Sequence, residues 1–273
     1  MPGHKICQTF ILMPLIIMAL ASISHSETFP IPETTVQPVF ADRKGCFVIM
    51  ECLSDALSTF HPEVSSEKLP PCSTFKIWNT LIGLESGIIS FPDDSFYKWD
   101  GEARFIPEWN KDLTLEEAFQ VSCVPAFQNL ARKIGLEQMR IWIDKIGYGD
   151  CDVSSGVDVF WLPKPGRKTI LISPEEQVIL ICKLVTGKLG FSDKAQAVLK
   201  EIMVVRKTDH GTLYGKTGSG TNETGKSNLG WFVGYVETNG KNYAFACAIK
   251  GETLTGRDAR IIVNTILENH GYL

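Results

Sequence analysis

The sequence lacks the features that would exclude an ordinary globular fold. Its 23 glycines and 14 prolines in 273 residues are near ordinary usage, which excludes collagen-like and low-complexity chains. Basic residues are not in excess, since 27 Lys and Arg face 31 Asp and Glu, which argues against nucleic acid as the main partner. Only one long apolar run is present, so a polytopic membrane protein is excluded. With 44% hydrophobic residues, the chain can offset the entropy lost on folding and bury a sizeable core.

The single apolar run lies at the N-terminus. Met1–Lys5 carries one lysine and no acid, Ile6–Ala21 is mostly apolar, and small polar residues follow. This order is typical of a secretory signal peptide, and the run is short of the roughly 20 residues that span a bilayer as an anchor. We therefore expect residues 1–26 to be a cleaved signal and 27–273 to be one catalytic domain, periplasmic or secreted, with no stable membrane insertion.

Seven cysteines follow the predicted signal, and no Cys and His spacing indicates a zinc site or any other metal site. Cys46 and Cys52 flank an alternating apolar run. As ends of one strand they would lie about 20 Å apart, whereas a disulfide needs Cα atoms within about 7 Å. An odd number leaves at least one thiol free, and we expect most of the seven to be small buried side chains. Their pairing stays open.

Strand signals cluster near both ends of the chain, with helical spacing between them and no internal repeat. Asn239-Gly240 is a strong hairpin turn between the last two strands. The expected strands are 45–52, 211–219, 229–237 and 243–250. Four helices are expected at 73–87, 137–146, 194–205 and 257–268. Two more helices are expected to start at the capping boxes of Thr114 and Ser173. The pattern predicts an α/β (α+β) fold: one antiparallel sheet from both chain ends, with an inserted helical lobe.

Ser73 and Lys76 form the first candidate for chemistry. Three residues apart on a helix, they share one face, and a base beside a serine hydroxyl activates it as a nucleophile. The Ser-x-x-Lys pattern alone is weak, because Ser65 with Lys68 and Ser95 with Lys98 repeat it in loops. The alternative for Ser73 is a helix-capping serine followed by a surface lysine.

Two further motifs follow. Ser122 and Val124 lie in the helical lobe, where the alternative is a small helix-terminal serine. Lys216-Thr217-Gly218-Ser219 lies on a strand, where a lysine beside a glycine suits a substrate carboxylate. A phosphate-binding loop is excluded there, because only three residues separate Gly211 from Gly215 and the motif needs four. Tyr148-Gly149-Asp150 is a further candidate motif, and its alternative interpretation is a plain turn after a helix.

These motifs, in this order, resemble those of the serine β-lactamases and penicillin-binding transpeptidases. Residues 71–77, Pro-Cys-Ser-Thr-Phe-Lys-Ile, are similar to the nucleophile segment of the class D (oxacillinase-type) β-lactamases. Further similar segments are 98–101, 108–110, 157–162 and 230–234. The resemblance covers nearly all of 27–273 and implies a two-lobed fold with the active site between the sheet and the helical lobe.

The resemblance also implies the role of each site residue. Ser73 would attack a β-lactam carbonyl, and Lys76 would take up CO2 to become N6-carboxylysine, the general base. Ser122 would carry a proton to the leaving nitrogen, Trp161 would donate to the carbamate, and Val124 would help to enclose it. The expected substrate-binding residues are Lys216, Thr217, Gly218, Ser219 and Arg260, with Arg257 as the alternative arginine. No cofactor is implied beyond CO2 or bicarbonate.

The residues support this chemistry on their own. An exposed lysine, with a pKa of about 10.4, is no base at neutral pH, but an apolar pocket lowers that pKa. No glutamate motif of the class A enzymes is present, which leaves Lys76 as the base. One departure is Asp150, where the family usually has asparagine, so we assign it no substrate role.

Three activities share these residues. The first is hydrolysis of penicillins and oxacillin-type β-lactams, conferring antibiotic resistance. The second is a β-lactam sensor or penicillin-binding domain that is acylated without turnover, and the third is a D,D-peptidase. The expected partner is a small β-lactam, and the chain is expected to be a monomer or homodimer. Sensors of this type are usually attached to transmembrane segments, whereas this sequence shows only the predicted cleavable signal. The sequence therefore favours the hydrolase.

Overall fold

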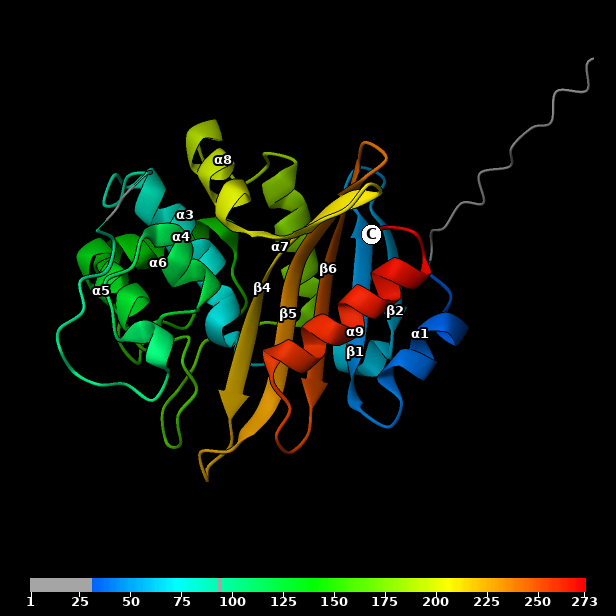
Figure 1. The fold of residues 1–273 in the computed structure, drawn as a ribbon, viewed down its shortest axis with the longest axis horizontal. Helices are drawn as coiled ribbons and strands as arrows, with labels where there is room; N and C mark the ends of the chain where they lie inside the picture. Colours follow the sequence, from blue (N-terminus) through cyan, green and yellow to red (C-terminus); the bar gives the residue numbers. More distant parts are fainter. Residues whose placement is uncertain (1–30, 93–94) are drawn as a thin grey trace, which may run out of the picture.

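A computed structural model describes residues 31–92 and 95–273, so the predicted signal at 1–26 lies outside the described residues. The centre is a six-stranded antiparallel sheet with the strand order β2-β1-β6-β5-β4-β3 (Figure 1). The strands are β1 Lys44–Glu51, β2 Ala56–Phe60, β3 Val204–Lys207, β4 Gly211–Thr221, β5 Ser227–Thr238 and β6 Lys241–Lys250. Within the described ranges, no helix has both the length and the apolar character of a membrane span.

Both chain ends build the sheet, as the sequence predicts. Strand β1 pairs with β6 from Lys44 opposite Lys250 to Glu51 opposite Tyr243. The Asn239-Gly240 turn joins β5 to β6, and both residues have positive φ, 49° and 71°. Two positive φ values are what the tight hairpin turn demands, and Asn-Gly is the pair that tolerates them. The predicted α+β architecture is confirmed.

Helices cover both faces of the sheet, and a helical lobe stands beside it (Figure 1). α1 and α9 lie against one face; α7 lies against the other. The helices are α1 Glu33–Phe40, α2 Pro62–Ser65, α3 Lys76–Glu85, α4 Leu115–Gln120, α5 Val124–Ile134, α6 Leu136–Ile146, α7 Pro174–Val185, α8 Asp193–Ile202 and α9 Gly256–Asn269, with 3-10 turns η1 Cys72–Phe75 and η2 Pro107–Trp109.

Alternation along the strands divides the interior into two cores. On β1, Val48 and Met50 face the core shared with α7 and the helical lobe, whereas Phe47 and Ile49 face the core under α1 and α9. Successive side chains of a strand point to opposite faces, so a sheet covered on both sides must be apolar on both. This two-sided burial fixes the position of β4, the strand that carries the Lys216 motif.

Several elements depart from the sequence prediction. The helix expected at 194–205 ends at Ile202, and Val204 pairs with Tyr214 as the start of edge strand β3. Val204 and Val205 are β-branched and suit a strand, so pairing with β4 prevails over helical spacing there. Strand β2 and helix α1 were not predicted; β2 is short and only partly buried, which gives little periodicity to detect.

One disulfide joins Cys52, just after β1, to Cys182 in α7. Cys46 is a free thiol, so the expectation that Cys46 and Cys52 do not pair is confirmed. The free cysteines in the described ranges are Cys46, Cys72, Cys123, Cys151 and Cys247, of which only Cys151 is not fully buried. The expectation of mostly buried thiols is therefore confirmed. No group of three potential metal ligands gathers in the described part of the chain.

Candidate active site

The turn that carries Ser73 is held by the strands beside it. Ser73 lies in the 3-10 turn η1, so the α-helix begins at Lys76 and not at the serine itself. Trp231 Nε1 of β5 donates to Pro70 O at 2.9 Å, and Thr74 Oγ1 donates to Pro71 O at 2.7 Å. These bonds fix the backbone on both sides of the serine and leave its hydroxyl half-buried.

Lys76 is buried completely and lies beside the serine hydroxyl. Its Nζ is 2.7 Å from Ser73 Oγ, and its side chain is 0% exposed. Burial lowers the pKa of Lys76 well below the ordinary value, and the nearby charge of Lys216 lowers it further. The nearby thiols of Cys123 and Cys72 act in the opposite direction and raise the pKa of Lys76. The surroundings therefore favour an uncharged amine, the form that can act as a base or add CO2.

Ser122 and Lys216 meet where the helical lobe contacts the sheet. Ser122 lies between α4 and α5 with a φ of 56°, and Lys216 Nζ of β4 donates to its Oγ at 3.1 Å. Lys216 is 4% exposed, and burial lowers its pKa to about 7. A lysine with this pKa can give and take a proton near neutrality, so it can exchange a proton with the Ser122 hydroxyl.

The middle of β4 lies between the nucleophile turn and the start of α9. A Cβ on Gly218 would lie 2.9 Å from Pro71 O, so only glycine permits this approach. On the other side, Ser219 Oγ accepts from Gly256 N at 2.9 Å, and a Cβ on Gly256 would lie 2.8 Å from Thr217 Cβ. The β4 motif is therefore in place beside Ser73, as the sequence predicts.

The two candidate arginines both lie on α9 and are both exposed. Arg257 directly follows Gly256, the residue that touches β4, and Arg260 lies one turn further along the helix, on the same face as Gly256. Neither has a hydrogen bond or ion pair in the described structure that would fix its side chain elsewhere. The start of α9 thus supplies a cation near Thr217.

Trp161 supplies a buried donor without an acceptor. Its ring stacks on Phe75 with centroids 5.6 Å apart, and its Nε1 is buried with no hydrogen-bond partner among residues 31–92 and 95–273. An unpaired buried donor is costly, so such a group indicates a missing acceptor. A carbamate on Lys76 fits this feature, because it would bring acceptor oxygens into the buried surroundings of the amine. Val124, half-buried at the start of α5, follows Ser122 closely in the chain.

Gln177 of α7 is a contributor that the sequence did not reveal. Its Nε2 donates to Thr74 Oγ1 at 3.1 Å and to Tyr148 OH at 3.3 Å, which braces the nucleophile turn from behind. The sequence signal for this role was the position of Gln177, beside the apolar face of the helix predicted to start at Ser173. Asp150 accepts from Leu171 N at 3.0 Å, a bond that orders the turn.

The other two Ser-x-x-Lys copies do not form a nucleophile and base. Lys68 pairs with Glu176 and Lys98 pairs with Asp112, each at 2.8 Å and each on the surface. Only Ser73 and Lys76 combine burial with direct contact.

A family model for the penicillin-binding protein transpeptidase domain matches residues 43–268. The probable β-lactamase YbxI of Bacillus subtilis is 34% identical over 253 residues, covering 93% of this chain and 91% of that protein. A crystal structure of a class D β-lactamase from Bacillus subtilis superposes with a TM-score of 0.80 at 34% identity, covering 87% of this chain and 96% of that one.

The chain belongs to the class D β-lactamase family. The resemblance drawn from the motifs is thereby confirmed, as is the two-lobed fold. The same family fold also occurs in a receptor: the C-terminal domain of the Bacillus licheniformis BlaR penicillin-receptor superposes with a TM-score of 0.80 at 30% identity, covering 88% of this chain and 95% of that one. The predicted enzyme class, a serine β-lactamase, is confirmed by the class D relatives, and the receptor shows that the same fold also occurs in a penicillin-receptor.

Proposed function

We propose that this protein is a serine hydrolase that opens β-lactams, penicillins and oxacillin-type compounds among them, and so confers antibiotic resistance. The observation that carries the proposal is the 2.7 Å contact between Ser73 Oγ and the fully buried Nζ of Lys76. A serine beside a desolvated lysine is an activated nucleophile, and the contact at Ser73 is shorter than the 3.1 Å contact between Ser122 and Lys216.

The base in this proposal is Lys76 carrying CO2. The uncharged amine adds CO2 and releases one proton, which yields a carbamate with two acceptor oxygens. The unpartnered Nε1 of Trp161 and the low pKa of Lys76 support this choice. The carbamate would take the Ser73 proton during acylation and pass it on to Lys216, which restores the proton given through Ser122 to the ring nitrogen. It would then take a proton from the water that attacks the ester and return it to Ser73 Oγ as the ester is cleaved.

Acylation forms the bond between Ser73 Oγ and the carbonyl carbon and breaks the bond from that carbon to the ring nitrogen. Ser122 gives its proton to the nitrogen and is reprotonated by Lys216, whose Nζ donates to it. We assign the substrate carboxylate to Lys216, Thr217 and an arginine of α9, and the oxyanion to the backbone N–H groups of Ser73 and Ser219. Water then cleaves the ester and restores the serine.

Location and assembly complete the proposal. The basic, apolar and small-residue order of residues 1–26 supports export with cleavage, so the enzyme would act in the periplasm or outside the cell. We propose a monomer or homodimer that needs CO2 or bicarbonate and no other cofactor.

A sensor is the second candidate function, because a regulatory protein BlaR1 from Bacillus licheniformis is 32% identical over 255 residues, 90% of this chain and 41% of that protein. The two functions differ only in the fate of the acyl-enzyme. Mass spectrometry after mixing with benzylpenicillin distinguishes them: a hydrolase releases penicilloate within seconds, and a sensor keeps the adduct on Ser73. Cleavage of a D-Ala-D-Ala peptide would instead support a D,D-peptidase.

The decisive measurement is turnover of a penicillin panel with and without bicarbonate. We expect activity to fall at low pH, where the carbamate loses CO2, and to return when bicarbonate is added. Lys76→Ala should be inactive, and Ser73→Ala should give no adduct. Full activity after rigorous removal of CO2, or in Lys76→Ala, would refute the carbamate.

A further inference from the structure

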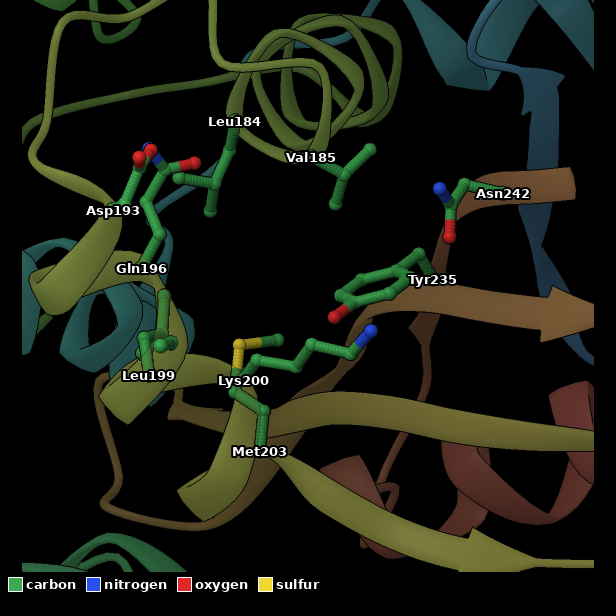
Figure 2. A pocket seen from close by; sticks show the side chains of 10 residues that line it. Leu184, Val185, Asp193, Gln196, Leu199, Lys200, Met203, Tyr235 and Asn242 are labelled. Carbon is green, nitrogen blue, oxygen red and sulfur yellow. The ribbon is translucent and has the colours of Figure 1, made fainter. Parts of the chain in front are cut away.

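A cavity of about 260 Å³ lies between α7, α8 and the ends of β5 and β6, apart from the candidate active site (Figure 2). Its wall contains no residue of the proposed catalytic or substrate-binding set. The lining residues are Leu184, Val185, Asp193, Gln196, Ala197, Leu199, Lys200, Met203, Tyr235 and Asn242. A cavity smaller than the roughly 300 Å³ of drug-sized sites takes a single-ring molecule.

The wall combines an apolar body with a few polar atoms at its edges. Leu184 and Val185 face the ring of Tyr235 across the opening, while the polar end of Gln196 lies on the opposite side from the Tyr235 hydroxyl (Figure 2). Gln196 Nε2 is already used by Phe191 O at 2.9 Å, which leaves its carbonyl oxygen as an acceptor. The cavity therefore suits a compact apolar ring with one hydrogen-bond donor.

The charges at the edge select against anions. The Lys200 ammonium is paired with Glu237 at 2.6 Å, so its charge is compensated. Asp193 also lines the cavity and forms no ion pair among the residues that the structure describes. One uncompensated negative charge favours neutral or cationic ligands, whereas β-lactams are anions. The cavity is thus distinct in chemistry from the proposed substrate site.

The same wall is bonded to both segments that carry the Ser122 and Lys216 pair. Met203 O accepts from Gly215 N at 2.9 Å, directly before Lys216. Ile202 O, next to the wall, accepts from Gln120 Nε2 at 2.7 Å, two residues before Ser122. A shift of the last turn of α8 would therefore move both sides of the 3.1 Å contact between Lys216 and Ser122.

We propose that this cavity is a second ligand site for a small aromatic amine or alcohol, and that its occupancy changes the rate at which Ser73 is acylated. The tyrosine pair supports the coupling, because Tyr235 in the wall stacks on Tyr214 of β4 with centroids 4.5 Å apart. A ligand that contacts Tyr235 would therefore also shift Tyr214, which lies on β4 two residues before Lys216.

Three probes of one shape test the ligand class: benzylamine, benzyl alcohol and benzoate, titrated into the full protein by calorimetry and by NMR. We expect saturable binding of the first two and a dissociation constant for benzoate at least about tenfold higher than for benzylamine. Asp193→Asn should remove the advantage of benzylamine over benzyl alcohol. No saturable binding of either probe, or equal binding of benzoate, would overturn the site.

A blocking variant tests the location. Ala197→Phe places a ring in the cavity from the exposed side of α8 and should abolish binding; Val185→Phe is the second blocking variant should the first lose its native circular dichroism. Binding that persists in a folded blocking variant would overturn the location.

The coupling is read from the rate of Ser73 acylation by benzylpenicillin, followed by mass spectrometry. This readout needs no turnover, so it applies to a hydrolase and to a sensor alike. We expect saturating benzylamine to change the rate by about threefold or more in the wild type and not in Ala197→Phe. An unchanged rate at full occupancy would overturn the coupling.

Discussion

At the scale of single residues, the site is defined by two lysines that the fold keeps poorly solvated. Lys76 and Lys216 are both almost fully buried, and the charge of Lys216 further lowers the pKa of Lys76. Two ammonium groups in such a place would repel each other and lose their hydration. Burial therefore favours the uncharged amine of Lys76, the form that the chemistry at Ser73 requires.

Lys76→Met should therefore raise the free energy of unfolding at pH 7 while abolishing acylation. The wild-type lysine is uncharged when folded and charged when unfolded, so unfolding takes up a proton. Wild-type stability should rise by up to about 1.4 kcal/mol per pH unit above the folded pKa and level off near the unfolded value. Urea unfolding at pH 7, 8 and 9 in CO2-free buffer measures this.

The matched control is Lys133→Met, which removes an exposed lysine of α5. A wild-type unfolding free energy with the same pH dependence as Lys76→Met would contradict the buried uncharged amine.

The arginines of α9 give a second prediction at this scale. Gly256 lies against Thr217, and Arg260, four residues later, lies on the same helix face as Gly256, whereas Arg257 lies on a different face. We expect Arg260→Ala to raise KM for benzylpenicillin by roughly tenfold or more, the loss of one charge-assisted hydrogen bond, and Arg257→Ala to have a smaller effect. Steady-state kinetics of the two variants decides, and a larger effect in Arg257→Ala would contradict the assignment of Arg260.

At the scale of elements, the active site depends on how closely β4 approaches η1. Gly218→Ala would place a Cβ 2.9 Å from Pro71 O and should separate the two elements. Overpacking of this kind costs about 1–3 kcal/mol, and acylation of Ser73 should slow by about tenfold or more. Gly220→Ala is the matched control, since its nearest neighbour is the side-chain Sγ of Cys72 at 3.1 Å. Equal acylation rates in both variants would refute the role of the close approach.

The elements also show how far sequence could lead. Both capping boxes, at Thr114 and Ser173, are present and start α4 and α7, because their hydrogen bonds are local. The contact between Ser73 and Lys76 could be predicted because the two residues lie three positions apart on one turn. The bond from Gln177 to Thr74 and the pairing of Val204 with Tyr214 could not, because they depend on contacts between distant segments.

At the scale of the whole molecule, the disulfide joins residues 130 positions apart and ties α7 to the end of β1. Cys182→Ala should lower the free energy of unfolding by about 2–5 kcal/mol, since the unfolded chain loses a long closed loop. Activity at 25 °C should persist, because neither sulfur belongs to the site. Chemical unfolding with and without reductant measures the effect, with Cys151→Ala as the control. Equal losses in both variants would contradict a stabilising bond.

Strand β1 is paired with β6 between residues 44 and 250, a separation of 206 positions. During synthesis, the apolar run of β1 therefore emerges long before its central partner exists. A ribosome that stops before Tyr243 would release a chain with the β1 and β5 edges open, and open edges promote aggregation. The sheet can therefore close only after synthesis is almost complete, and the edge of β1 that β6 covers stays open until then.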